Sequence, residues 1–242
     1  MNMKSTSIHD ERVSGDGLLA HSTGEIETDS VSAETLAYRH ILSRIRAGLL
    51  VPGARVRTED VANEIGMSRQ PVREAIRRLE AQGYVTSRPN RGAMVSKYTP
   101  DQLLELFEIR AALEGLAMRL ALSRVQQEDF LEIDKLLASL DSAGTETGLW
   151  LEWHDKFHKV LCALSGRPRL VHEIARMNAA LEPYMRLWFL HTGVEVDAGS
   201  DHAPLVNALR SGYPGHAEQV MRDHILETAP MIITYLEGNK ID

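Results

Sequence analysis

The chain has 242 residues, enough for one or two domains, and its 43% hydrophobic and 25% charged residues are ordinary for a globular protein. Its apolar runs are shorter than the roughly 20 residues of a membrane-spanning helix, and its N-terminus lacks the pattern of a signal peptide. We therefore expect a cytoplasmic protein without a membrane partner. Cys162 is the single cysteine, which excludes an internal disulfide, and its apolar surroundings favour a place in the core over a role as nucleophile.

The net charge of −7 conceals an uneven distribution along the chain. Residues 1–30 carry a net charge of −4, residues 31–99 carry +6 and residues 100–242 carry −9. Attraction to phosphate is screened over about 8–10 Å, so the charge of the basic segment matters more for nucleic-acid binding than the total. The charge step coincides with a change from a mixed to an all-helical pattern. We predict a flexible tail at 1–30 and domains at 31–98 and 99–242.

The basic segment shows three helical stretches followed by a hairpin. Apolar residues at spacings of three and four predict helices at about 34–49, 58–65 and 68–82. Short strands are predicted at 84–86 and 93–95, joined by residues 87–92. This order of helices followed by a small hairpin is typical of a winged helix-turn-helix.

The remainder of the chain is helical throughout. Thr99-Pro100-Asp101-Gln102 has the residue pattern of a capping box, with proline at the first helical position. Six helices are predicted, at about 100–123, 127–141, 147–164, 168–191, 199–211 and 214–237. The predicted fold class is therefore mainly α, with an N-terminal winged helix and a C-terminal all-α bundle.

The helix predicted at 68–82 carries a basic face. Arg69, Arg73 and Arg77 are four residues apart, and Ser68 stands at a favourable N-cap position. An arginine at the start of a helix can pair with guanine in the major groove, while the free backbone amides can hold phosphate. The alternative is an ordinary solvated basic face, but the order of helix, glycine turn, basic helix and basic hairpin favours DNA binding.

These residues resemble the N-terminal domain of the GntR family of bacterial regulators. The resemblance covers residues 34–96 and is densest over Gly66-Met67-Ser68-Arg69-Gln70-Pro71-Val72-Arg73-Glu74-Ala75. It implies that Arg69 and Arg73 read guanines, that Ser68 and Gln70 support phosphate or base contacts, and that Arg91-Gly92 forms the tip of the wing. It also implies a homodimer on a short palindrome in double-stranded DNA.

Four histidines of the C-terminal part form a candidate metal site. His154 and His158 are four residues apart, so their rings leave one face of a helix, while His202 and His224 fall in two later helices. Neutral imidazoles that meet inside a helical bundle can hold a divalent metal. Spacing alone supports only the first pair, and both of its members can equally be ordinary polar residues.

Residues 103–225 resemble the FCD effector domain of the FadR subgroup, with matches at Glu108–Glu114, Phe157-His158 and Leu164–Leu170. In such domains one Asp and three His hold a metal, and His158, His202 and His224 match the three histidines. His154 stands where the family has its Asp. We therefore expect either a site rich in nitrogen ligands, which favours Zn²⁺ or Ni²⁺ over Mg²⁺ or Ca²⁺, or loss of the metal.

Arg110 and Glu114 lie one helical turn apart in the same part of the chain, and both are candidate effector-binding residues. The resemblance implies that the arginine faces an effector cavity, where a cation beside a metal suits a small carboxylate. The alternative is an intrahelical salt bridge that contributes a few tenths of a kcal/mol.

Together these patterns predict a DNA-binding transcriptional regulator that is controlled by a small organic acid. They favour a repressor over an activator. An alternative is a regulator for which the metal itself is the signal. A metal-dependent enzyme is disfavoured, because the segment from His154 to His158 lacks the glutamate of an HExxH motif.

Overall fold

The structure is a computed structural model that describes residues 31–88, 92–143, 146–192 and 198–239. The predicted flexible tail and Arg91, the predicted tip of the wing, lie outside the described residues.

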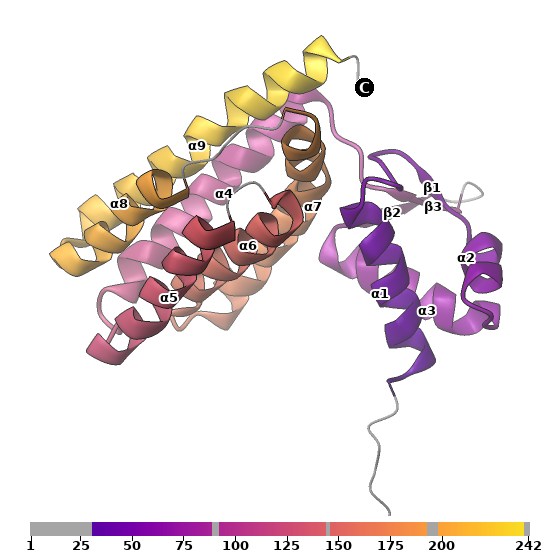
Figure 1. Ribbon diagram of the computed structural model, residues 1–242, viewed down its shortest axis with the longest axis horizontal. Helices are drawn as coiled ribbons and strands as arrows, with labels where there is room; N and C mark the ends of the chain where they lie inside the picture. The colour runs from indigo at the N-terminus through magenta and orange to yellow at the C-terminus, as the bar shows by residue number, and fades with distance from the viewer. Residues whose placement is uncertain (1–30, 89–91, 144–145, 193–197, 240–242) are drawn as a thin grey trace, which may run out of the picture. The chain divides into compact units, whose positions relative to one another are not determined.

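The N-terminal part contains three helices and a small sheet (Figure 1). In chain order its elements are α1 (Ala33–Arg46), β1 (Arg55–Val56), α2 (Thr58–Glu64), α3 (Arg69–Gln82), β2 (Val85–Arg88) and β3 (Gly92–Val95). The buried face of α3 consists of Val72, Ala75, Ile76 and Leu79, the residues whose spacing predicted this helix. They share a core with Ala37, Ile41, Leu42 and Ile45 of α1.

The sheet has the strand order β1-β3-β2, and both pairings are antiparallel. The predicted hairpin is present as β2 and β3, although β2 begins one residue later than predicted and continues to Arg88. β1 was not predicted, because two residues carry too little alternation to be recognised. With α2 and α3 this sheet makes the expected winged helix-turn-helix.

The C-terminal part consists of helices, as predicted, and each helix end lies within two residues of its expected place. The helices are α4 (Pro100–Ala121), α5 (Gln127–Ala143), α6 (Thr147–Ala163), α7 (Pro168–Thr192), α8 (Ala198–Ser211) and α9 (Pro214–Gly238). The capping box at the start of α4 is formed: Thr99 Oγ1 accepts from the Gln102 amide, and Gln102 Oε1 accepts from the Thr99 amide.

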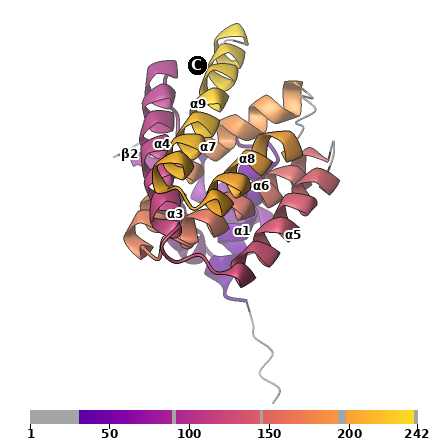
Figure 2. The same ribbon diagram turned by 90° about the vertical axis from the view of Figure 1, so that its left-hand side faces the viewer.

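Helices α4 and α9 lie side by side in both ribbon views (Figures 1 and 2). Gly115 of α4 makes the close approach possible, because a Cβ at that residue would lie 3.1 Å from the Glu218 carbonyl oxygen of α9. The core beneath contains Leu103, Phe107 and Met118 of α4 together with Met221 and Ile225 of α9. This packing fixes the helices that carry Arg110, Glu114 and His224. Among the described helices, none has the length and hydropathy needed to cross a membrane.

Candidate nucleic-acid interface and metal centre

The start of α3 presents a set of exposed polar side chains that do not contribute to the core. The exposed residues are Ser68, Arg69, Gln70, Arg73 and Arg77. Arg69 contacts Glu59 of α2 at 3.3 Å, and Gln70 Nε2 donates to Glu74 Oε1 at 2.9 Å. Exposed partners of this kind exchange readily with water or with another ligand. The basic face is therefore accessible, and it follows directly from the helical spacing of the sequence.

Ser68 occupies the N-cap position of α3 with an extended backbone, but its side chain makes no capping hydrogen bond. The amides of the first turn consequently lack the side-chain acceptor that the sequence suggested. Such amides suit an external anion such as a phosphate. Gly92, at the start of β3, has a φ of 73°, and a Cβ built on it would have no atom within 4 Å, so the space beside this residue is open.

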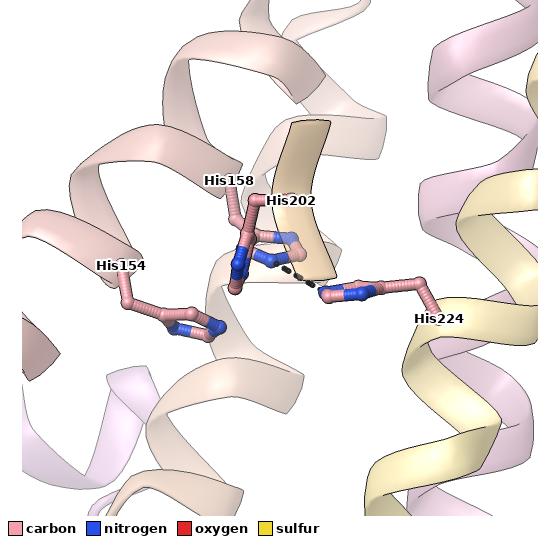
Figure 3. Close-up of side chains that lie close together, drawn as sticks. All are labelled: His154, His158, His202 and His224. Atoms are coloured by element: carbon pink, nitrogen blue, oxygen red, sulfur yellow. Dashed lines mark hydrogen bonds between the residues drawn. The ribbon is translucent and has the colours of Figure 1, made fainter. Parts of the chain in front are cut away.

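The four predicted histidines meet inside the helical part, although they come from three helices (Figure 3). His154 and His158 are on α6, His202 is on α8 and His224 is on α9. One ring nitrogen from each lies within 4.8 Å of the others, and the Nε2 atoms of His158 and His224 are 3.3 Å apart. Four ligands at Zn–N distances of 2.0–2.1 Å would be separated by about 3.4 Å. Small side-chain shifts would bring the four rings to that geometry.

The chemistry of the cluster also fits a metal. Burial is the main cause that lowers the pKa of His154 and of His224 well below the ordinary value, and neighbouring positive charge lowers both further. Both imidazoles are therefore neutral at physiological pH and have lone pairs to offer. A buried nitrogen of His154, Nδ1, has no hydrogen-bond partner, and Trp150 stacks on this ring at 4.8 Å between centroids. An all-nitrogen donor set of this kind suits Zn²⁺ or Ni²⁺.

Glu114 is hydrogen-bonded to one member of the histidine cluster, His158. Its side chain is fully buried, and its Oε2 atom accepts from His158 Nδ1 at 2.8 Å. Burial would raise the pKa of Glu114, but the charge of Arg110 and the hydrogen bonds from His158 and Arg110 outweigh it and hold this pKa well below its usual range. The ionised carboxylate fixes the proton of His158 on Nδ1, so the Nε2 lone pair is directed at the other three rings.

Arg110 and Glu114 form the expected pair across one helical turn. The Nε atom of Arg110 donates to Glu114 Oε1 at 2.7 Å, and both side chains are buried. Arg110 also lines a small cavity of about 10 Å³ together with His154 and His158; we call it the inner cavity. Arg110 therefore forms the intrahelical salt bridge and also lies beside the histidines; the two arrangements do not exclude each other.

Asp155 is not part of the histidine cluster. It directly follows His154, the residue that stands where the family has its aspartate. Its carboxylate lies 3.9 Å from His154 Nδ1, beyond hydrogen-bond distance, and it lines the inner cavity instead. The angular offset of adjacent residues on a helix, about 100°, accounts for this. In the structure, too, His154 and not Asp155 takes the place of the family's aspartate.

Sequence reasoning missed a polar stripe on α7. Asn178, Glu182 and Arg186 follow one another at intervals of four, and the last two are buried. Glu182 accepts hydrogen bonds from Arg186, from Arg46 of α1 and from Tyr84. Asn178 and Glu182 also line the inner cavity. The interval of four in the otherwise apolar stretch 177–190 was the available signal.

Comparison with known proteins assigns both parts of the chain. Residues 34–95 match the family "Bacterial regulatory proteins, gntR family", and residues 105–227 match the FCD domain. The chain is 27% identical to the HTH-type transcriptional repressor GlaR of Escherichia coli over 212 residues, covering 84% of this chain and 96% of that one.

Two further likenesses agree with that assignment. The chain is 30% identical over 192 residues to a protein of Paenarthrobacter nicotinovorans named as a probable D-xylose utilization operon transcriptional repressor, covering 78% of this chain and 84% of the relative. Among solved structures, E. coli McbR/YncC shares the fold, with a TM-score of 0.73 and 23% identity, over 85% of this chain and 99% of that chain.

Proposed function

Because the chain belongs to the gntR family of bacterial regulatory proteins and carries an FCD domain, it is a transcriptional regulator and not an enzyme, and we propose that it is a repressor that binds a palindromic operator as a homodimer. In this proposal residues 31–98 read DNA, and residues 99–242 bind the effector and form the dimer. The exposed polar face at the start of α3 is the observation that carries the DNA-binding assignment.

We assign base and phosphate contacts to this face and to the wing. Arg69 and Arg73 donate to guanine in the major groove, Ser68, Gln70 and Arg77 support base or phosphate contacts, and Arg91-Gly92 contacts the backbone or minor groove. Arginine suits this task because its planar fork matches the O6 and N7 acceptors of guanine. Two half-sites about one helical turn apart would match the two DNA-reading domains of a dimer.

Substitution of Arg73 tests this assignment. Operator sequences selected from a randomised DNA library by the full-length protein serve as probes, and binding is measured by fluorescence anisotropy. Loss of one bidentate arginine contact costs about 1–3 kcal/mol, so Arg73→Ala should weaken binding about 5- to 150-fold and relax base preference. Arg169→Ala removes an exposed arginine at the start of α7 and should change neither. Unchanged affinity and preference in Arg73→Ala would refute the assignment.

We further propose that His154, His158, His202 and His224 hold a divalent metal, Zn²⁺ or Ni²⁺, and that a small organic acid binds beside it. When bound, the ion would supply positive charge and Lewis acidity. The neutral imidazoles add no negative charge, and the charges of Arg110 and Glu114 cancel each other. The buried site would therefore keep the full charge of the ion, which favours an anionic ligand. Arg110, at the inner cavity, provides the donor for its carboxylate.

Metal content tests the cluster directly. Purified protein loaded with Zn²⁺ or Ni²⁺ and then dialysed should retain about one ion per chain, whereas His158→Ala/His202→Ala should retain almost none. His216→Ala/His172→Ala removes two exposed histidines and serves as the matched control. Equal, near-zero content in the wild type and in the cluster variant would remove the metal from the proposal.

A second candidate is that the metal itself is the signal. Four protein ligands around a tetrahedral ion leave no open coordination position, and the inner cavity of about 10 Å³ has room for about one water molecule. Operator binding measured during titration with Zn²⁺ alone, and then with acids on the metal-loaded protein, separates the two. A response to metal without any response to acids would favour the second candidate.

A further inference from the structure

A second and much larger cavity adjoins the inner one. This outer cavity of about 380 Å³ is lined by Tyr38, Arg46, Gln82 and Tyr84 of the N-terminal part and by residues of α6 and α7. Asp155, Asn178 and Glu182 line both cavities. These three side chains are the shared wall between the space beside Arg110 and the space beside the DNA-reading part.

The sizes of the two cavities restrict how a ligand can reach Arg110. The inner cavity holds about one water molecule, whereas the outer cavity falls in the range of pockets that enclose small organic ligands. A ligand larger than water that places an acid group beside Arg110 must therefore extend across the shared wall, and its remaining atoms have space only in the outer cavity.

Asn178 offers a polar contact to a ligand that extends across the shared wall. Its Oδ1 atom is buried and has no hydrogen-bond partner, while its Nδ2 atom donates to Glu114 Oε1 at 3.4 Å. The reverse orientation of the amide would set two oxygens against each other, so the unpaired group is an acceptor. A buried acceptor without a donor is unfavourable, and a ligand hydroxyl passing the shared wall would supply that donor.

On its outer side, the shared wall contacts residues of the DNA-reading part. Glu182 Oε1 accepts from Arg46 Nε at 2.7 Å, and Glu182 Oε2 accepts from the Tyr84 hydroxyl. Gln82, the last residue of α3, lines the same cavity and accepts from Tyr38 at 2.8 Å. A ligand in the outer cavity would thus contact the end of the helix whose start carries the basic face.

We propose that the effector is an elongated hydroxy acid that occupies both cavities. Its carboxylate lies beside Arg110, its hydroxyl group donates to Asn178 Oδ1, and its chain lies against Gln82 and Tyr84. Effector binding is then read directly by the DNA-binding part, through a contact that both parts share with the ligand. This inference rests on the proposed effector function of the helical part.

A series of 2-hydroxy acids from glycolate to 2-hydroxyhexanoate tests the inference, because these acids keep the hydroxyl group beside the carboxylate while the chain lengthens. The acids are titrated into metal-loaded, full-length protein by calorimetry. Each methylene that enters the outer cavity should raise affinity about fourfold. Ala175→Trp, which adds a large ring to the lining of the outer cavity, should abolish this gain and leave glycolate binding unchanged. Ala138→Trp, at an exposed alanine of α5, should preserve the gain.

A second variant probes the side of the cavity formed by the DNA-reading part. Gln82→Trp adds a large ring to this side of the outer cavity, and it should lower the affinity for 2-hydroxyhexanoate at least threefold while glycolate binding is unchanged. A series without length dependence, or an equal gain in Ala175→Trp, overturns the inference. If all acids then release the operator equally, the proposed function still stands. If no acid binds, the effector role of the helical part falls together with the inference.

Discussion

Glu114 shows how one buried carboxylate can prepare a metal site without binding the metal. It accepts from His158 Nδ1 at 2.8 Å and from Arg110 Nε at 2.7 Å, so both of its oxygens are occupied. A carboxylate in this role orients the imidazole and makes its other nitrogen a stronger ligand. We therefore regard Glu114 as a positioning residue and not, as the sequence suggests, as a contact of the effector.

Substitution of Glu114 should weaken metal binding without removing any proposed ligand. Glu114→Gln is expected to lower Zn²⁺ affinity about 10- to 100-fold, because the neutral amide no longer fixes the His158 proton by charge. Competition with a chromophoric chelator measures the affinity. Glu108→Gln, an exposed substitution on the same helix, should leave it unchanged. An unaltered affinity in Glu114→Gln would contradict the positioning role.

The sequence supports local pairs of residues far better than clusters. His154 with His158, and Arg110 with Glu114, were recognisable because residues four apart share a helix face. The approach of His224 to His158 depends on how α9 packs on its neighbours, and the two residues are 66 positions apart. Only the resemblance to a known family suggested that meeting, and the structure supplies its geometry.

At the scale of elements, the crossing of α4 and α9 holds the site together. Arg110 and Glu114 belong to one of these helices and His224 to the other. A Cβ at Gly115 would lie 2.7 Å from Arg222 Cγ and 3.1 Å from the Glu218 carbonyl oxygen. The absence of a side chain at Gly115 is therefore what lets the two helices approach closely.

A large side chain at Gly115 should disturb both the fold and the metal site. Gly115→Leu is expected to reduce the free energy of unfolding by about 1–3 kcal/mol through overpacking. It should also weaken Zn²⁺ binding, because a displaced α9 moves His224 away from the other three histidines. Urea denaturation and metal titration measure these effects. Gly148→Leu, where a Cβ meets nothing within 4 Å, should change stability by less than about 0.5 kcal/mol. Equal stabilities of the two variants would refute this account of the crossing.

Helices were predictable here because their periodicity extends over many residues. The six helices of the C-terminal part follow from spacing, caps and the Gly-Pro breaks near residues 166–168 and 212–214. β1 was missed because its two residues are defined by pairing with β3, almost forty positions later, and not by their own pattern. Long-range pairing of this kind leaves no local signal.

At the scale of the whole molecule, Glu182 joins the two functional regions. It lies on the shared wall of the two cavities and pairs with Arg46, which is 136 positions away in sequence. Neither a charge count nor helical spacing predicts such a contact, because each arginine and glutamate of the chain has many possible partners. Allosteric control requires that contacts of this type differ between the ligand-bound and the ligand-free state.

Under the second candidate, in which the metal is the signal, Tyr84→Phe should reduce the coupling between metal and operator while preserving both binding sites. It removes one hydrogen bond to Glu182 and leaves the pairs with Arg46 and Arg186 in place. We expect the stability to fall by about 1 kcal/mol and the ratio of operator affinities with and without Zn²⁺ to shrink about threefold or more. Tyr213→Phe, at an exposed tyrosine, should leave the ratio unchanged.

Thermodynamic linkage gives this prediction an internal check. If Zn²⁺ changes operator affinity by some factor, the operator must change Zn²⁺ affinity by the same factor, because both describe one coupling free energy. Anisotropy measures the first factor and chelator competition in the presence of operator DNA measures the second. In Tyr84→Phe both factors should decrease together. A reduced ratio in one experiment alone would mean that the substitution damaged a binding site, whereas two unchanged ratios would show that the signal does not pass through Glu182.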